Sequence, residues 1–97
     1  MGEFGWAITC LFYSALHMIE AQLLRLGIVS ANHRQRDLYI RRDPDLSSIL
    51  RPYALLKRES ENARYECITY SARDVTRLRR VAYAPLVTHV HRLLGVS

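Results

Sequence analysis

The first third of the chain is apolar on nearly every side of a predicted helix. Residues 5–26 are fair helix formers, and the stretch Phe4–Ile19 carries no formal charge. Gly27 follows at the position where a glycine in the left-handed conformation ends a helix. A helix that is apolar all round is buried all round. The pattern therefore predicts a central helix over 5–26, or one that is shared with a second subunit.

This apolar stretch also requires a comparison with a membrane span. It is shorter than the roughly 20 residues needed to cross a bilayer, and it contains Thr9, Ser14 and His17. Only Glu3 precedes it as a charge, so the basic region of a signal peptide is missing. We interpret it as a buried helix of a cytoplasmic protein without a membrane partner, and expect His17 to be a core histidine. Residues 1–4 are not used in this interpretation.

Two further helices are predicted between residues 32 and 62. Ser30 is placed to cap a short surface helix over 32–41. The pair Asp43–Pro44 is typical of a helix start, with Asp as the N-cap and Pro at the first position. The third helix then runs over 44–62, and Pro52 should kink it or split it near Leu50.

The remaining third contains one loop and one long helix. Residues 63–70 indicate a loop with local β character, and Ser71–Asp74 form a capping box with Asp in place of the usual Glu. The last helix covers 72–94, with a kink at Pro85 and an end at Gly95. The sequence has no repeat and no linker, so it predicts a single all-α domain over 1–97, an up-and-down bundle of four to five helices without a sheet.

Length and composition fit this prediction. A chain of 97 residues makes one domain, and 49% apolar with 24% charged residues excludes disorder.

Cys10 and Cys67 have no zinc spacing and are expected as reduced intracellular thiols. His89 and His91 are two residues apart and point to opposite sides of a helix. No Walker A loop, dinucleotide turn, nucleophile elbow or HExxH is present, so we expect no metal and no cofactor.

Charge is divided unequally along the chain, whose net charge is +5. Residues 1–32 carry only Glu3, Glu20 and Arg25, whereas residues 33–97 carry the other 13 basic and 7 acidic side chains. A basic rear part favours an anionic partner such as RNA, a nucleotide or an acidic protein. The alternative is an ordinary solvated surface rich in Arg.

Three groups of basic residues are candidates for such a partner. Arg73, Arg77 and Arg80 recur at helical spacing on the outer face of the last helix. His33–Arg36 stands at the start of the short helix, where free backbone N–H groups favour an anion. Arg64 and Tyr65 lie in the predicted loop, where an Arg can hold a phosphate and a Tyr can stack on a base. The alternative for the Arg stripe is a plain solvated helix face, and the alternative for the other two groups is ordinary capping and salt-bridging.

We expect His33, Arg36, Arg64 and Tyr65 to converge, with Arg73 at the edge. In three long antiparallel rods, the first-to-second and third-to-fourth connections would lie at the same end. The N-terminus of the last helix would add its positive dipole there. The competing interpretation is that Arg64 only ties the loop down through Glu61 or Asp74.

Several segments of the chain together have the pattern of a known family. They are Phe12–Ala21, Leu23–Leu24, Gly27–Ile28 and His33, and then Ser60–Tyr65, Tyr70–Ser71 and Ala82–Leu94. These segments resemble the HEPN superfamily, and the resemblance covers the chain from about Trp6 to Leu94. It implies an up-and-down helical bundle, usually a homodimer, found beside nucleotidyltransferases in toxin–antitoxin pairs, in defence and RNA-processing systems, and as binding modules.

The ribonuclease motif of that superfamily is missing. Its ribonucleases carry an Arg, four to six residues, and then a His, whereas Arg25 to His33 and Arg80 to His89 are both too far apart. Arg64–Tyr65 instead matches an Arg-Tyr pair of the non-ribonuclease members, which favours a binding role.

Three hypotheses follow from these patterns. The first is a dimeric HEPN-like module that binds RNA, a nucleotide or a nucleotidyltransferase partner. The second is a metal-independent ribonuclease that uses His33 with Arg36 or Arg64. The third is a structural subunit of a larger assembly. The apolar first helix further predicts self-association, with Trp6 and Tyr13 at the contact.

Overall fold

The computed structural model describes residues 2–29, 32–66 and 68–95 and is helical, with no strand among them. This confirms the all-α prediction. The elements, in chain order, are α1 Glu3–Arg25, α2 His33–Arg42, the 3₁₀ turn η1 Ser47–Ile49, α3 Leu50–Tyr65, α4 Ala72–Leu78, the π-helical turn η2 Arg79–Tyr83, and α5 Ala84–Leu94.

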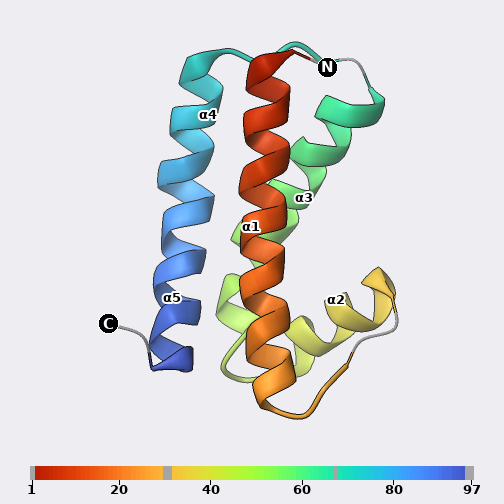
Figure 1. Ribbon diagram of the computed structural model, residues 1–97, viewed down its shortest axis with the longest axis vertical. Coiled ribbons are helices and arrows are strands. Elements are labelled where there is room, and N and C mark those ends of the chain that lie inside the picture. Colours follow the sequence, from red (N-terminus) through yellow and green to blue (C-terminus); the bar gives the residue numbers. More distant parts are fainter. Residues whose placement is uncertain (1, 30–31, 67, 96–97) are drawn as a thin grey trace.

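The bundle is flat, with principal extents of 38 × 29 × 17 Å. In the view down its shortest axis, α1 lies in front, between α3 and the rod formed by α4, η2 and α5, and the short α2 crosses the lower right (Figure 1). Only one side of α1 therefore faces neighbouring helices. The buried residues along its inner side share one core with α3 and the last rod; this core includes Ile8, Phe12, Ala15, Ile19, Leu23, Tyr53, Leu56, Leu78, Leu86 and Val90.

The helix ends follow the capping residues in most places. α1 ends in a Schellman motif, in which Ile28 N–H donates to Leu23 O at 2.9 Å and Gly27 has a φ of 79°. Gly95, with a φ of 76°, ends α5 as predicted. The capping box of Ser71 and Asp74 is also confirmed.

The caps of the middle elements differ from the prediction. Asn32, whose side chain accepts from Gln35 N–H, caps α2; Ser30, the predicted cap, lies outside the described residues. Asp43 caps only the tight turn that follows it, accepting from the backbone N–H groups of Asp45 and Leu46. A full α-helix begins later, at Leu50.

Both prolines lie where the regular α-helix is interrupted. Pro52 lies in the first turn of α3, where backbone N–H groups have no intrahelical acceptor. The segment predicted as one helix over 44–62 is divided here, because the 3₁₀ turn η1 ends at Ile49 and α3 begins at Leu50, which confirms the predicted split near Leu50. Pro85 follows directly on the π-helical turn η2. A proline lacks the N–H that would bond the carbonyl four residues earlier, and a widened turn accommodates its ring.

Two placements correct the sequence prediction. α3 continues to Tyr65, so Arg64 and Tyr65 belong to its last turn and not to a loop. Arg64 Nε donates to the carbonyl of Ser60 at 3.3 Å, a contact that favours a basic residue near a helix C-terminus. His17 is exposed, because it lies on the outward side of α1, and is not a core histidine.

The two connections expected at one end lie at opposite ends. Residues 26–29 turn back at the lower end of α1, whereas residues 68–70 lie beside its N-terminus (Figure 1). The expectation assumed that each helix runs the full length of the bundle, including α2. Because α2 is too short for that, α3 starts where α1 ends, and the next connection falls at the other end.

Candidate functional site

The most polar of the described pockets opens between α1, α3 and the N-terminus of α2. It has a volume of about 430 Å³. Three elements contribute to it: the middle of α1, the first residue of α2 and the C-terminal half of α3. The lining residues are Phe12, Tyr13, His33, Lys57, Glu61, Arg64 and Tyr65, and we call this the α1–α3 pocket.

Arg64 is held in a fixed position in this pocket by two tyrosines. Its guanidinium carbon lies 5.4 Å from the ring centroid of Tyr13 and 5.1 Å from that of Tyr65. Nη1 donates to the Tyr13 hydroxyl at 2.7 Å. Cation–π contacts of this kind orient a guanidinium without neutralising it.

No carboxylate of the described residues forms an ion pair with Arg64. Neither Glu61 nor Asp74 ties it down, so the competing interpretation of Arg64 as a loop anchor is wrong. Its Nη2 has no hydrogen-bond partner in the described part of the chain. An oriented cation with a free donor is suited to bind an anion.

His33 is the second nitrogen donor of the pocket. Its Nδ1 lies 2.7 Å from Nη1 of Arg36, one turn further along α2. Because a guanidinium can only donate, Nδ1 accepts and the ring proton of the neutral imidazole sits on Nε2. His33 therefore has an N–H left to donate.

Arg36 lies behind His33 and does not line the pocket. It is buried and pairs with Glu20 of α1, with Nη2 at 3.4 Å from the carboxylate. Its Nε has no partner among the described residues. Arg36 thus joins α2 to α1 and fixes the ring of His33.

Lys57 is already engaged with α2. Its Nζ lies 2.8 Å from one oxygen of Asp37, and the Tyr53 hydroxyl donates to the other oxygen at 2.8 Å. Burial, with this hydrogen bond, raises the pKa of Tyr53. The trio fixes the distance between α2 and α3 and leaves Arg64 as the unpaired cation of the pocket.

The structure brings together three of the predicted site residues. His33, Arg64 and Tyr65 line the same pocket, whereas Arg36 lies behind it. Arg73, on α4, does not line it. Arg73, Arg77 and Arg80 are exposed along α4 and η2, as expected for the outer face of the last helix.

Sequence reasoning missed Tyr13 and Lys57 as part of this site. A signal was present, since Lys57, Glu61 and Arg64 have the spacing of one helix face. Because the third helix was predicted to end at residue 62, Arg64 was not counted on the same helix face as Lys57 and Glu61. Tyr13 comes from a different helix, and its closeness to Arg64 has no local signal.

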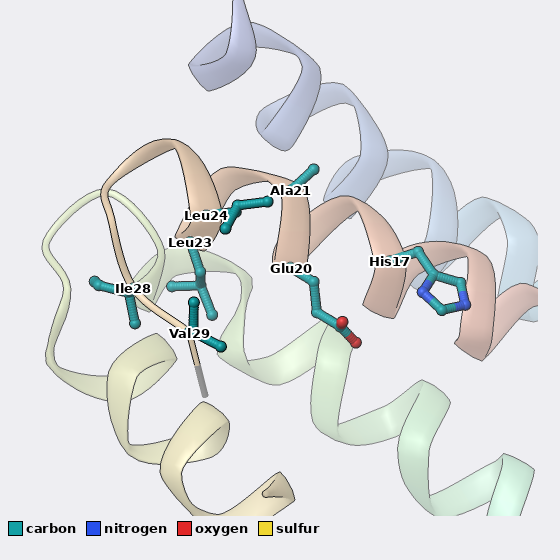
Figure 2. A pocket seen from close by; sticks show the side chains of 7 residues that line it. All are labelled: His17, Glu20, Ala21, Leu23, Leu24, Ile28 and Val29. Carbon is teal, nitrogen blue, oxygen red and sulfur yellow. The ribbon is translucent and has the colours of Figure 1, made fainter. Parts of the chain in front are cut away.

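A second, more apolar pocket of about 300 Å³ opens beside the C-terminal half of α1. Figure 2 shows Glu20 between His17 and the apolar side chains of Leu23 and Val29. We call it the α1 pocket. Its other lining residues are Ala21, Leu24 and Ile28.

The remaining histidines and cysteines form no metal centre in the parts of the chain that are described. His89 contacts the carbonyl of Asp45 through Nε2, which attaches α5 to the turn before α3. Cys10 is exposed and free, while Cys67 lies outside the described residues.

α1 is long and apolar enough to cross a membrane on length and composition alone, but 50% of the apolar window is buried in the bundle. It extends beyond the uncharged stretch of the sequence by Glu3 at its N-terminal end and by residues 20–25 at its C-terminal end.

Comparison with protein-family models, with curated proteins and with solved structures gives no match.

Proposed function

We propose that this chain is a small HEPN-like helical module that binds the phosphate of an RNA or nucleotide in the α1–α3 pocket, without cleaving it. One observation carries the proposal. Arg64 has no carboxylate partner, is held between two tyrosine rings, and has a free Nη2 at the pocket. Charge-assisted hydrogen bonds from such a guanidinium are the usual means of binding phosphate.

The neighbouring residues support a nucleotide over a simple anion. Tyr65 is 70% exposed, so its ring offers a free face on which a base can stack. His33 supplies an N–H donor from the facing helix, and Arg36 fixes its orientation. Arg64 and His33 would thus bind the phosphate from two helices, and Tyr65, next to Arg64, would stack on the base.

The orientation of His33 favours binding over cleavage. A general base needs a free lone pair within reach of the proton it removes. The lone pair on Nδ1 of His33 is directed at Arg36, and Nε2 carries the proton in the neutral ring. This supports a non-catalytic role, with metal-independent RNA cleavage by His33 and Arg36 as the alternative.

The biological setting rests on the family resemblance. It favours a cytoplasmic protein acting with a nucleotidyltransferase-type partner in a toxin–antitoxin, defence or RNA-processing system. Exposed Arg73, Arg77 and Arg80 would extend the contact to a longer RNA or to an acidic protein.

Binding of a labelled single-stranded RNA and of a nucleoside monophosphate, measured by fluorescence anisotropy and calorimetry, tests the proposal. Arg64→Ala should weaken both by about tenfold, the effect of one charge-assisted hydrogen bond. Tyr65→Ala should weaken binding without changing stability, because the ring is exposed. Arg92→Ala removes the same charge from an exposed position on α5 and is the matched control.

Equal losses in Arg64→Ala and Arg92→Ala would mean unspecific charge attraction and would overturn the proposal. A loss confined to Arg77→Ala would move the site to the α4–η2 face. RNA cleavage that survives a chelator and is abolished by His33→Ala would establish the ribonuclease alternative.

A further inference from the structure

A groove lies between α2 and α3, next to the α1–α3 pocket. It consists of two adjoining pockets of about 440 and 420 Å³, which share Asp37, Arg41 and Lys57. In Figure 1 the two helices run in opposite directions, with α2 descending at the lower right and α3 rising behind α1. We call this surface the α2–α3 groove. Its other lining residues are His33, Arg34, Leu38, Leu50, Arg51, Tyr53, Ala54, Arg58 and Glu61.

The acidic side chain in the middle of the groove is fully engaged. The hydroxyl of Tyr53 donates to one oxygen of Asp37 at 2.8 Å, and Nζ of Lys57 donates to the other at 2.8 Å. Asp37 and Lys57 therefore neutralise each other. The charge of the groove is set by the arginines around this pair.

The arginines stand at the two ends of both walls. Arg34 and Arg41 are seven residues apart on α2, and Arg51 and Arg58 are seven residues apart on α3. Seven residues of helix span about 10 Å. Because the helices are antiparallel and Asp37 bridges them between these ends, Arg41 comes opposite Arg51, and Arg34 comes opposite Arg58.

These arginines are exposed and largely without acidic partners. Arg34, Arg41 and Arg51 form no ion pair and no side-chain hydrogen bond within the part of the chain that is described. Arg58 has a contact of 3.5 Å with its neighbour Glu59. Cations grouped in this way repel one another, so a partner that brings carboxylates would relieve the repulsion and gain ion pairs.

An apolar side chain lies between the two arginines of each wall. Leu38 stands between Arg34 and Arg41 and is 40% exposed, and the exposed Ala54 stands in the same way on α3. Half-buried Leu50 adds to the apolar surface at one end. Each wall thus presents a cation, an apolar side chain and a second cation. An amphipathic helix with acidic side chains beside its apolar stripe is complementary to both walls.

Other anionic occupants fit this groove less well. A small anion cannot reach arginines that are about 10 Å apart along one helix. Single-stranded RNA is bound largely by stacking of its bases on exposed aromatic rings. Among the described residues between the arginines, the aromatic side chain is Tyr53, which is 1% exposed. His33 stands at the end of the groove that adjoins the α1–α3 pocket.

We propose that the α2–α3 groove docks an acidic amphipathic helix of a partner protein, with its apolar stripe on Leu38 and Ala54 and its carboxylates on the four arginines. The proposal goes beyond phosphate binding and does not depend on it, since Arg64 and Tyr65 do not line this groove. Asp37 and Lys57 would be covered as a neutral pair, which avoids burying an unpaired charge.

A synthetic peptide tests the proposal. The probe is a fluorescein-labelled peptide of three heptads, with a leucine stripe flanked by glutamates that recur every seven residues. A second peptide of the same composition, in shuffled order, has the same charge but no apolar stripe. In fluorescence anisotropy at about 0.15 M salt, where distant charges are screened, the amphipathic peptide should bind at least about tenfold more tightly.

Charge reversal in the groove locates the contact. Arg41→Glu combined with Arg51→Glu should weaken binding of the amphipathic peptide by at least about tenfold, because two attractions become repulsions. A peptide with lysines in place of the glutamates should prefer this double variant to the unmodified chain. Both arginines are exposed and unpaired, so the circular dichroism spectrum should not change.

Two controls separate this contact from the rest of the surface. Arg73→Glu combined with Arg92→Glu makes the same change of charge at exposed positions on α4 and α5, and should leave peptide affinity within about twofold. Arg64→Ala should weaken nucleotide binding and leave peptide binding unchanged. Failure of one proposal is thereby distinguished from failure of the other.

Three outcomes would overturn the proposal. The first is equal affinity for the amphipathic and the shuffled peptide, which would mean plain charge attraction. The second is an equal loss in the two double variants, which would place the contact outside the groove. The third is no peptide binding together with binding of oligouridylate that Arg41→Glu and Arg51→Glu abolish, which would make RNA the occupant.

Discussion

The hydroxyl of Tyr13 on α1 accepts a hydrogen bond of 2.7 Å from Nη1 of Arg64 on α3, 51 residues further along the chain. The same two side chains form a cation–π contact. One pair of residues therefore joins the two helices with the largest shared contact and also shapes the wall of the α1–α3 pocket. The pair contributes both to the stability of the fold and to the proposed ligand binding, and separate substitutions can distinguish the two contributions.

Tyr13→Phe should keep the ring over Arg64 and remove only the hydrogen bond. Because the pair is solvent-accessible, we expect a loss of about 1 kcal/mol or less in the free energy of unfolding. The freed guanidinium should still bind phosphate. Urea titration followed by circular dichroism measures the first effect. Tyr39→Phe is the control, since the described residues offer its hydroxyl no partner; equal effects of both substitutions would refute the prediction.

The N-terminus of α4 should lose stability in acid because of Asp74. Backbone and side-chain hydrogen bonds from Ser71 lower the pKa of this carboxyl below its usual value of 3.8. A lowered folded pKa means that the stabilisation is present above the unfolded pKa and is lost as pH falls through the folded value. Melting temperatures between pH 6 and pH 2 should fall less steeply for Asp74→Asn than for the unmodified chain. Parallel curves would contradict this.

Two tyrosines should titrate late in alkali. Partial burial, followed by the hydrogen bond to Glu59, raises the pKa of Tyr70 to about 12, and burial raises that of Tyr53 further. Since the neutral phenol is the form stabilised, this contribution to folding is present below about pH 10 and is lost as pH rises through the folded pKa. Absorbance titration at alkaline pH should show the Tyr70 step, and Tyr70→Phe should remove it.

The sequence predicted the helical class because the apolar periodicity and the caps agreed. Gly27, Ser71 with Asp74, and Gly95 each act through their own backbone geometry, which needs no knowledge of the rest of the fold. The end of α3 was predicted three residues too early, because the contact that supports its last turn is made by Arg64 itself.

The candidate site was only partly predictable for a different reason. His33 and Tyr65 line the same pocket because the N-terminus of α2 lies beside the C-terminal half of α3, an arrangement set by packing that no local sequence pattern shows. His17 is exposed although its neighbours are apolar, because only one side of α1 is covered by other helices. Composition alone cannot separate the covered side of such a helix from the open one.

Ser60 on α3 provides a test of packing in the bundle. It is fully buried, and its hydroxyl has no hydrogen-bond partner among the described residues. A buried hydroxyl without a partner carries the cost of its lost hydration. Alanine removes that group, leaves the backbone carbonyl that accepts from Arg64, and has a higher helix propensity.

We therefore expect Ser60→Ala to raise the free energy of unfolding by about 1 kcal/mol, measured by urea denaturation. Leu56→Ala, one turn earlier and equally buried, should instead lower it by about 2–5 kcal/mol, because it removes apolar contacts and leaves a cavity. The opposite signs at two buried positions one helical turn apart distinguish an unsatisfied hydroxyl from a packing contact. If Ser60→Ala destabilises the protein, the hydroxyl is satisfied by a buried water molecule that the substitution displaces.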